Sequence, residues 1–280
     1  MNPRALAIWS GITMVLALVS TNPIDRALIL LVAINVTVSV CRPDRSLRGL
    51  TIMAITVSLG AVFVNALEAH SGSHRLASIP DGIPLVGGPI TLEAVAWGGA
   101  TALGICAALV AVAPLALGLD PHQLITALPR AMDRTATALA TSLVLIPAFG
   151  RTAKAIRDAQ RLRGWEPRGV RSWGAIVTPL VVGALESSVT VAESMEARGF
   201  GSSATRTHWS PEPVRRSDRA VVLTALAAAV IFGVGRSLGW SRDWLPFPDL
   251  IAPSISPVAC VVAGLLLTPV VVWQRHASTA

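Results

Sequence analysis

Six long apolar stretches, separated by polar ones, dominate the pattern of hydrophobic and polar positions along the chain. They cover residues 5–20, 27–41, 50–67, 90–117, 220–234 and 257–273. A helix that crosses the hydrocarbon core of a bilayer needs about 20 predominantly apolar residues, so the shorter stretches must draw in flanking positions. Asn22-Pro23 predicts a tight turn after the first stretch. The pattern therefore predicts an all-α membrane protein with about six transmembrane helices.

Composition indicates the same class. Hydrophobic residues make up 52% of the 280 and charged residues only 14%, whereas a soluble domain carries about 25% charged residues. A chain this apolar cannot cover its surface with polar side chains in water. The sequence also lacks the G-x-x-x-x-G-K-[ST] pattern of a phosphate-binding loop, so it offers no ATP site of its own.

The middle of the chain departs from the six-stretch pattern. Residues 124–146 are apolar but carry Arg130, Asp133 and Arg134. A charge near the bilayer centre costs roughly 2.5–3.5 kcal/mol on insertion scales, so we expect this segment along the cytoplasmic interface rather than across the lipid. Pro147 should kink or end its helix. Three regions follow: an N-terminal membrane region at 1–117, a cytoplasmic module at 118–218 and a C-terminal membrane region at 219–280.

Basic residues predict the orientation. The chain carries 23 Lys and Arg against 16 Asp and Glu. With six helices, the basic clusters at 42–48 and 151–219 fall on one side, together with Arg4 and Arg275, while the loops on the other side hold few basic residues. The positive-inside rule places the basic side, and with it both termini, in the cytoplasm. Because the basic residues alternate with membrane stretches, the positive net charge does not indicate nucleic-acid binding.

Two sequences in the middle region end alike, at Arg163-Gly164 and at Arg198-Gly199, 35 positions apart. Glycine adopts the left-handed conformation that ends many helices, and a cation in the last turn interacts favourably with the helix dipole. Either motif alone is compatible with an ordinary helix end. Arginine also binds a carboxylate through two parallel hydrogen bonds. The repeat therefore predicts a duplicated docking surface for a partner with two similar acidic grooves.

These motifs resemble the T component of energy-coupling-factor transporters, the transmembrane coupling proteins that include the CbiQ and BioN groups. The most specific string is residues 195–201, Met-Glu-Ala-Arg-Gly-Phe-Gly. The first motif differs in having Leu162 where the family has Ala. The string at 87–93 and the Asn22-Pro23 turn are also similar to family sequences, so the resemblance covers roughly residues 20–240.

The resemblance implies a subunit of the bacterial plasma membrane that is not an enzyme and holds no cofactor or metal. Two ABC ATPase subunits, or one fused double ATPase, would bind it from the cytoplasm. A membrane-embedded S component would capture a vitamin or a transition-metal ion for uptake. The residues implied for ATPase docking are Arg163, Gly164, Ala197, Arg198 and Gly199, with possible support from Ala159, Glu193, Glu196 and Phe200.

Several other interpretations remain open. A self-contained secondary transporter predicts ionisable residues inside the spans or an inverted repeat. A membrane anchor or assembly protein would use the arginines for lipid headgroups or for another partner. His70 and His74 lie four positions apart but lack a clear third ligand, so we expect no metal site there. Glu93 lies in a family-like string, and its role is not predicted.

Glu193 and Glu196 lie three positions apart on one helix face. They could pair with arginines of the preceding helix and fix the crossing of the two helices, or they could be solvated. The sequence favours neither arrangement.

Overall fold

The computed structural model describes residues 2–41, 45–69, 72–79, 88–119, 133–166, 169–200, 215–241 and 243–277. The chain forms two compact units. Unit 1 comprises residues 1–120 together with 214–280, and unit 2 comprises residues 121–213. The regions expected at the two ends of the chain thus fold together as one body.

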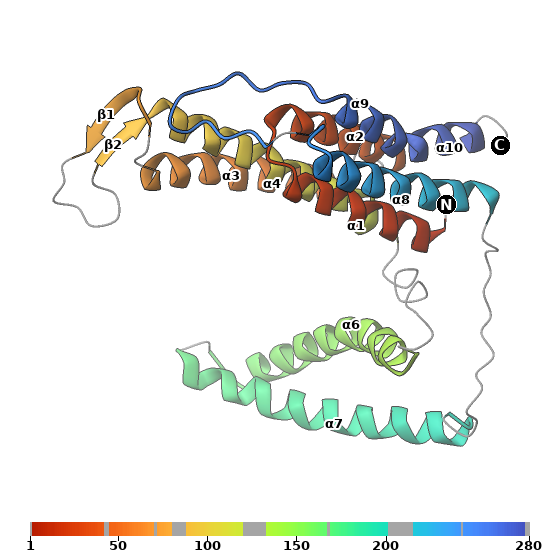
Figure 1. Ribbon diagram of the computed structural model, residues 1–280. Coiled ribbons are helices and arrows are strands. Elements are labelled where there is room, and N and C mark those ends of the chain that lie inside the picture. The colour runs from red at the N-terminus through yellow and green to blue at the C-terminus, as the bar shows by residue number, and fades with distance from the viewer. Residues whose placement is uncertain are drawn as a thin grey trace. The chain divides into compact units, whose positions relative to one another are not determined.

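Unit 1 is a helical bundle with one small hairpin (Figure 1). Its elements are α1 (Pro3–Val19), α2 (Pro23–Val40), α3 (Arg45–Glu68), β1 (Arg75–Ile79), β2 (Gly88–Thr91), α4 (Leu92–Gly118), α8 (Arg216–Ser237), α9 (Pro257–Leu266) and α10 (Thr268–Ala277). Unit 2 contains α6 (Asp133–Leu162), the 3₁₀ turn η2 (Val170–Trp173) and α7 (Gly174–Ala197). Helix α6 continues through Pro147, so this proline does not end it.

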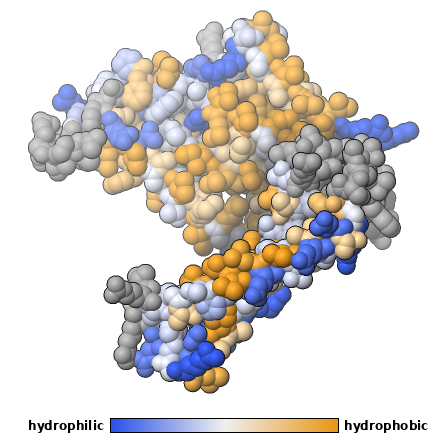
Figure 2. Space-filling view, turned by 90° about the horizontal axis from the view of Figure 1, so that it is seen from below, coloured by the Kyte–Doolittle hydropathy of each residue, from blue (hydrophilic) through white to orange (hydrophobic). Residues whose placement is uncertain are grey.

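Seven helices in the described part of the chain are long and apolar enough to cross a membrane, and α1 is a shorter apolar helix. This confirms the predicted all-α, multi-pass membrane protein. The seven include α6 and α7 of unit 2, although the sequence predicted a cytoplasmic module at 118–218. Large apolar side chains also cover much of the outer surface (Figure 2), as on α3, where Ile52, Leu59 and Phe63 are each about two-thirds exposed.

Three helices of unit 1 begin in the same way. Asn2, Asn22 and Ser256 each accept a backbone N–H with the side chain, and a proline follows each of them. The side chain accepts one backbone N–H of the first turn that would otherwise have no partner. The proline stands at a position whose N–H makes no hydrogen bond within the helix, so its missing N–H does not destabilise the helix. The apolar pattern predicted that the second helix begins at Ala27, but it begins at Pro23. Asp25 therefore falls in its first turn.

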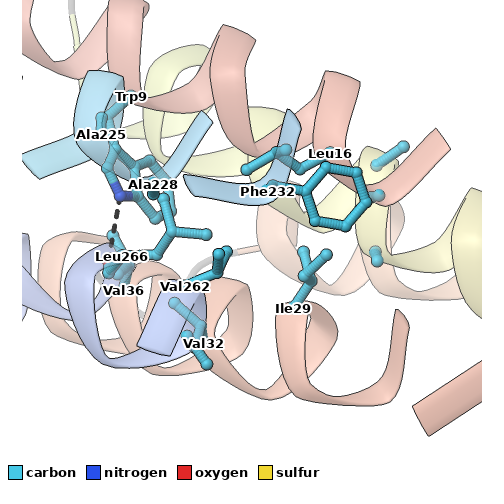
Figure 3. Close-up of a cluster of buried hydrophobic side chains, with 14 of the residues drawn as sticks. Trp9, Leu16, Ile29, Val32, Val36, Ala225, Ala228, Phe232, Val262 and Leu266 are labelled. Atoms are coloured by element: carbon cyan, nitrogen blue, oxygen red, sulfur yellow. Dashed lines mark hydrogen bonds between the residues drawn. The ribbon is translucent and has the colours of Figure 1, made fainter. Parts of the chain in front are cut away.

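The core of unit 1 lies between α1, α2, α4, α8 and α9 (Figure 3). Trp9 of α1 is fully buried there and donates a hydrogen bond from Nε1 to the carbonyl of Leu266, at 3.0 Å. Val32 from α2 and Phe232 from α8 belong to the same cluster. Because a buried indole N–H is costly without an acceptor, this bond fixes α1 against the end of α9.

Hydrogen bonds between distant loops define one face of unit 1. The Asn22 side chain donates to the carbonyl of Ser254 at 2.8 Å, and the Ser73 N–H donates to the carbonyl of Pro248 at 3.3 Å. The turn after α1, the segment before β1 and the loop before α9 therefore meet on the same face. These are the loops in which the sequence has few basic residues.

The opposite face carries the other helix ends. The Asn2 N–H donates to Asp218 Oδ1 at 3.0 Å, which sets the start of α1 beside the start of α8. At the end of α2, Cys41 Sγ lies 3.8 Å from the carbonyl of Ala113, close to the end of α4. A tight turn joins α1 and α2 on the first face, so the start of α1 and the end of α2 both lie on the second face. The start of α8 and the end of α4 lie beside them. The chain therefore leaves unit 1 after α4 and returns at α8 on this second face.

The loop expected before α4 contains a two-stranded antiparallel hairpin, with Ala77 opposite Ile90 and Ile79 opposite Gly88. The apolar pattern did not predict these strands, because they are short and β2 includes Gly88 and Pro89. Strand β2 leads directly into α4, whose N-cap is Thr91. The hairpin therefore brings residues 72–79 against the start of α4.

Candidate functional site

The first predicted helix end closes α6. The N–H of Gly164 donates to the carbonyl of Arg161 at 3.0 Å, and the N–H of Trp165 donates to the carbonyl of Gln160 at 2.9 Å. Gly164 has φ +82°, in the left-handed region. These two bonds with a left-handed glycine form a Schellman motif, which satisfies the last carbonyls of a helix. Arg163 occupies the C-cap position, and its side chain is exposed.

The second predicted helix end repeats this geometry. The N–H of Gly199 donates to the carbonyl of Glu196 at 2.8 Å, and the N–H of Phe200 donates to the carbonyl of Met195 at 2.9 Å. Gly199 has φ +76°, and Arg198 is the C-cap residue. Each of these residues is 35 positions after its counterpart in the first motif. The structure thus confirms the two equivalent helix ends predicted from the sequence.

A third helix end shows which part of the motif is distinctive. Helix α8 also closes with a left-handed glycine, Gly239 at φ +75°, and the N–H of Trp240 donates to the carbonyl of Gly235 at 2.8 Å. Its C-cap residue is Leu238. The backbone geometry alone is therefore a general way for this chain to end a helix. What sets the two ends in unit 2 apart is an exposed arginine at the C-cap.

The predicted supporting residues lie close in sequence to these helix ends. Ala159, Ala197, Glu193 and Glu196 are exposed, and the Phe200 side chain is 44% exposed. In the described part of the chain, no ion pair joins either glutamate to α6. Of the two arrangements left open for Glu193 and Glu196, the structure shows the exposed one, with both carboxylates on the surface of α7.

Two tryptophans pack together between the end of α6 and the start of α7. The Trp165 Nε1 donates to the carbonyl of Ser172 at 2.8 Å, and the Trp165 and Trp173 rings meet edge to face with centroids 6.5 Å apart. The Arg157 guanidinium lies 5.8 Å from the centroid of the Trp173 ring. We call this group of side chains, together with Gln160, the tryptophan joint. Trp165 follows the first Arg-Gly pair directly, and that adjacency is the sequence signal that could have indicated it.

Gln160 adds a further contact within the joint. Its Nε2 donates to the carbonyl of Ala175 in the first turn of α7, at 3.3 Å. The joint therefore holds the end of α6 to the start of α7. In Figure 1 the chain runs along α7 in the direction opposite to that along α6. The first arginine therefore lies near the start of α7, and Arg198, the C-cap residue of α7, lies at its other end.

A second polar cluster surrounds Glu93, in the first turn of α4. The Glu93 side chain is fully buried, and its Oε1 accepts from the His74 N–H at 3.2 Å and lies 2.8 Å from His74 Nδ1. Ser73 Oγ lies 3.1 Å from the same oxygen and 2.9 Å from Asp249 Oδ1. This cluster connects the hairpin, α4 and the loop before α9, so Glu93 has a structural role that the sequence did not indicate.

The cluster does not assemble a metal site. No group of three or more His, Cys, Asp or Glu side chains that could hold a metal ion occurs among the described residues. His70, which the sequence paired with His74, lies outside the described residues. The two histidines therefore remain without an assigned ligand.

Comparison with known proteins gives one result that covers most of the chain. A family model described as "CbiQ: Cobalt transport protein" matches residues 1–209. The match includes both Arg-Gly helix ends and all of unit 2 except its last few residues. No curated protein matches the chain.

Proposed function

Because the chain belongs to the CbiQ family of cobalt transport proteins, we propose that it is the energy-coupling transmembrane subunit of an energy-coupling-factor importer. In this proposal it carries no catalytic residue. Two ABC ATPase subunits, or one fused double ATPase, bind its two Arg-Gly helix ends and supply the ATP chemistry. A membrane-embedded S component captures the substrate. The family description favours a transition-metal ion over a vitamin as the cargo.

The observation that carries this proposal is the duplicated helix end. Two helices of unit 2 close with the same hydrogen bonds, the same left-handed glycine and an exposed arginine at the C-cap. A guanidinium can hold a carboxylate through two parallel hydrogen bonds and so fix the direction of approach as well as the contact. Two equivalent arginines match two equivalent acidic grooves, which a pair of like subunits presents.

Chain direction and charge support a cytoplasmic location for unit 2. The chain leaves and re-enters unit 1 on the same face, so unit 2 crosses the bilayer either twice or not at all. Two crossings would put the end of α6 outside the cell, together with the basic residues of its second half: Arg151, Lys154, Arg157 and Arg161. The positive-inside rule disfavours that arrangement. We therefore place both Arg-Gly ends in the cytoplasm, along with both termini of the chain.

In this arrangement, ATP-driven closing of the ATPase pair moves the two helix ends that are bound to it. Unit 2 passes the movement through α6 and through the segment before α8 to the membrane helices. The chain's own residues bind and transmit force, and no bond is made or broken on them. Substrate choice lies with the S component.

The experiment is co-purification of the tagged chain with its ATPases, combined with an uptake assay in cells. Arg163→Glu together with Arg198→Glu should abolish both ATPase capture and uptake, while the amount of protein in the membrane stays the same. Arg151→Glu is the matched control, because Arg151 is also an exposed arginine of α6 but lies away from the helix end. It should leave capture unchanged.

Two outcomes would overturn the proposal. Uptake by this chain alone, without any ATPase, would identify a self-contained secondary transporter. Unchanged ATPase capture by the double glutamate variant, combined with lost binding to vesicles containing anionic lipid, would identify the arginines as headgroup ligands of a membrane anchor.

A further inference from the structure

We infer that α7 sets the separation of the two docking arginines, and that the tryptophan joint fixes the first arginine to the start of α7. This inference rests on the proposed function and adds a requirement for the partner. The partner must present two equivalent acidic grooves separated by about the length of α7. The 24 residues of α7 correspond to roughly 36 Å at 1.5 Å per residue.

The first step is the attachment of Arg163 to α7. Arg163 precedes Trp165 by two residues, and the indole of Trp165 is bonded to Ser172 and packed against Trp173 at the start of α7. The Gln160 amide spans from the last turn of α6 to Ala175. These contacts join residues at the end of α6 to residues at the start of α7. The end of α6 therefore cannot move away from α7 without breaking a hydrogen bond and separating the two rings.

The second step is the position of Arg198. It is the C-cap residue of α7, so one continuous helix leads from the joint to the second docking point. An α-helix has a fixed rise per residue, and it therefore acts as a spacer of defined length. The exposed Arg198 and the exposed Arg163 lie at its two ends.

The third step is energetic. When two binding groups are linked, the second one binds at an effective concentration set by the link, and this gain disappears if the spacing does not match the two sites. A fixed spacing also reduces the conformational entropy lost when both ends bind. The joint and α7 together should therefore give the pair of arginines a much higher affinity than either arginine alone.

The separation can be measured on the full-length chain in nanodiscs. Spin labels are placed at Leu162→Cys and Ala197→Cys after Cys41, Cys106 and Cys260 have been replaced by Ala. Pulsed electron paramagnetic resonance should give one narrow distance distribution near the length of α7, roughly 36 Å before allowance for the label linkers. Trp165→Ala with Trp173→Ala should broaden it, whereas Trp240→Ala, an exposed tryptophan of unit 1, should not.

Affinity for the ATPase pair provides the second measurement. Duplicating residues 186–192 lengthens α7 by roughly 10 Å and returns the helix to nearly the same face. This variant should bind the ATPase pair as weakly as Arg198→Glu does, a loss on the order of 100-fold. The Trp165 and Trp173 double alanine variant should lose most of the affinity gained by linking the two arginines. Trp173→Phe keeps an aromatic ring and should therefore bind more tightly than the double alanine variant.

The outcomes separate this inference from the function on which it rests. If Arg163→Glu with Arg198→Glu abolishes binding but the lengthened α7 binds like the parent chain, the spacing inference is wrong and the proposed function stands. A narrow distance distribution in the tryptophan double variant would likewise overturn the role of the joint. If the double glutamate variant still binds the ATPases, the proposed function itself fails.

Discussion

Arg26, in the first turn of α2, donates a hydrogen bond from Nη1 to the backbone carbonyl of Ala100 in α4, at 2.7 Å. Its Nε donates to the carbonyl of Ser20 at 2.7 Å. The residue is only 8% exposed, and Gly104 leaves the space for it, because a Cβ at Gly104 would lie 2.9 Å from Nε. One charged side chain thus joins α1, α2 and α4.

The first prediction concerns this buried arginine. Arg26→Met should lower the stability of unit 1 by about 1–3 kcal/mol, because the Ser20 carbonyl loses its donor in a buried place. Gly104→Val should have a similar effect by displacing the guanidinium. Thermal unfolding of the purified protein in detergent measures both. Arg48→Met, at an exposed arginine of α3, should leave the unfolding temperature unchanged, and equal losses at positions 26 and 48 would contradict the prediction.

The second prediction concerns Glu93. Glu93→Ala should destabilise the hairpin by about 1–3 kcal/mol, because the His74 N–H and the Ser73 hydroxyl lose their buried acceptor. Glu93→Gln keeps an acceptor oxygen and should cost less. Hydrogen exchange over residues 72–79 reads the effect directly. Equal exchange in the parent chain and in Glu93→Ala would show that the cluster does not hold the hairpin.

The third prediction tests the close approach of Gly72 to the same carboxylate. Gly72 has φ +152°, and a Cβ there would collide with Glu93 Oε2. Gly72→Ala should therefore reproduce the faster hydrogen exchange of Glu93→Ala although every polar group is retained. Gly60→Ala is a suitable control, because nothing lies within 4 Å of a Cβ at that position. A protected hairpin in Gly72→Ala would argue against this tight contact.

The fourth prediction separates helix capping from docking. Gly164→Ala, Gly199→Ala and Gly239→Ala each place a side chain on a left-handed residue, which costs roughly 1–2 kcal/mol. All three should lower stability to a similar extent. The first two should also weaken ATPase capture, while Gly239→Ala should not, because the C-cap residue directly before Gly239 is Leu238 rather than an arginine. Gly199→Asn should restore much of the loss at that site, since Asn tolerates this conformation.

The fifth prediction concerns the side of the membrane on which α6 ends. Single cysteines at Leu162 and at Ala197, in a background without the native cysteines, should both be protected from a membrane-impermeant maleimide in intact cells. Both should react in inside-out vesicles. Trp240→Cys, on the opposite face of unit 1, should show the reverse pattern. Reaction of the Leu162 cysteine in intact cells would mean that unit 2 crosses the bilayer twice.

The sequence by itself was sufficient for the membrane class, for most of the helices and for the two Arg-Gly ends. These features depend on local properties. Apolar length decides whether a segment suits the bilayer, and a left-handed glycine closes a helix through bonds to residues within the preceding turn. The same locality explains why Asn22-Pro23 could be recognised as a turn, although the start of α2 was predicted four residues late.

Only the tertiary structure revealed the hydrogen bonds of Arg26, the cluster around Glu93 and the tryptophan joint. Arg26 meets Ala100 and Glu93 meets His74 only after helices and hairpin have packed in one register, and no pattern along the chain encodes that register. Sequence alone does not distinguish a tryptophan ring that faces lipid from one that packs against another ring, as Trp165 and Trp173 do. Local sequence therefore determined where the two C-cap arginines lie on their helices, and tertiary packing decided what holds the first of them to the start of α7.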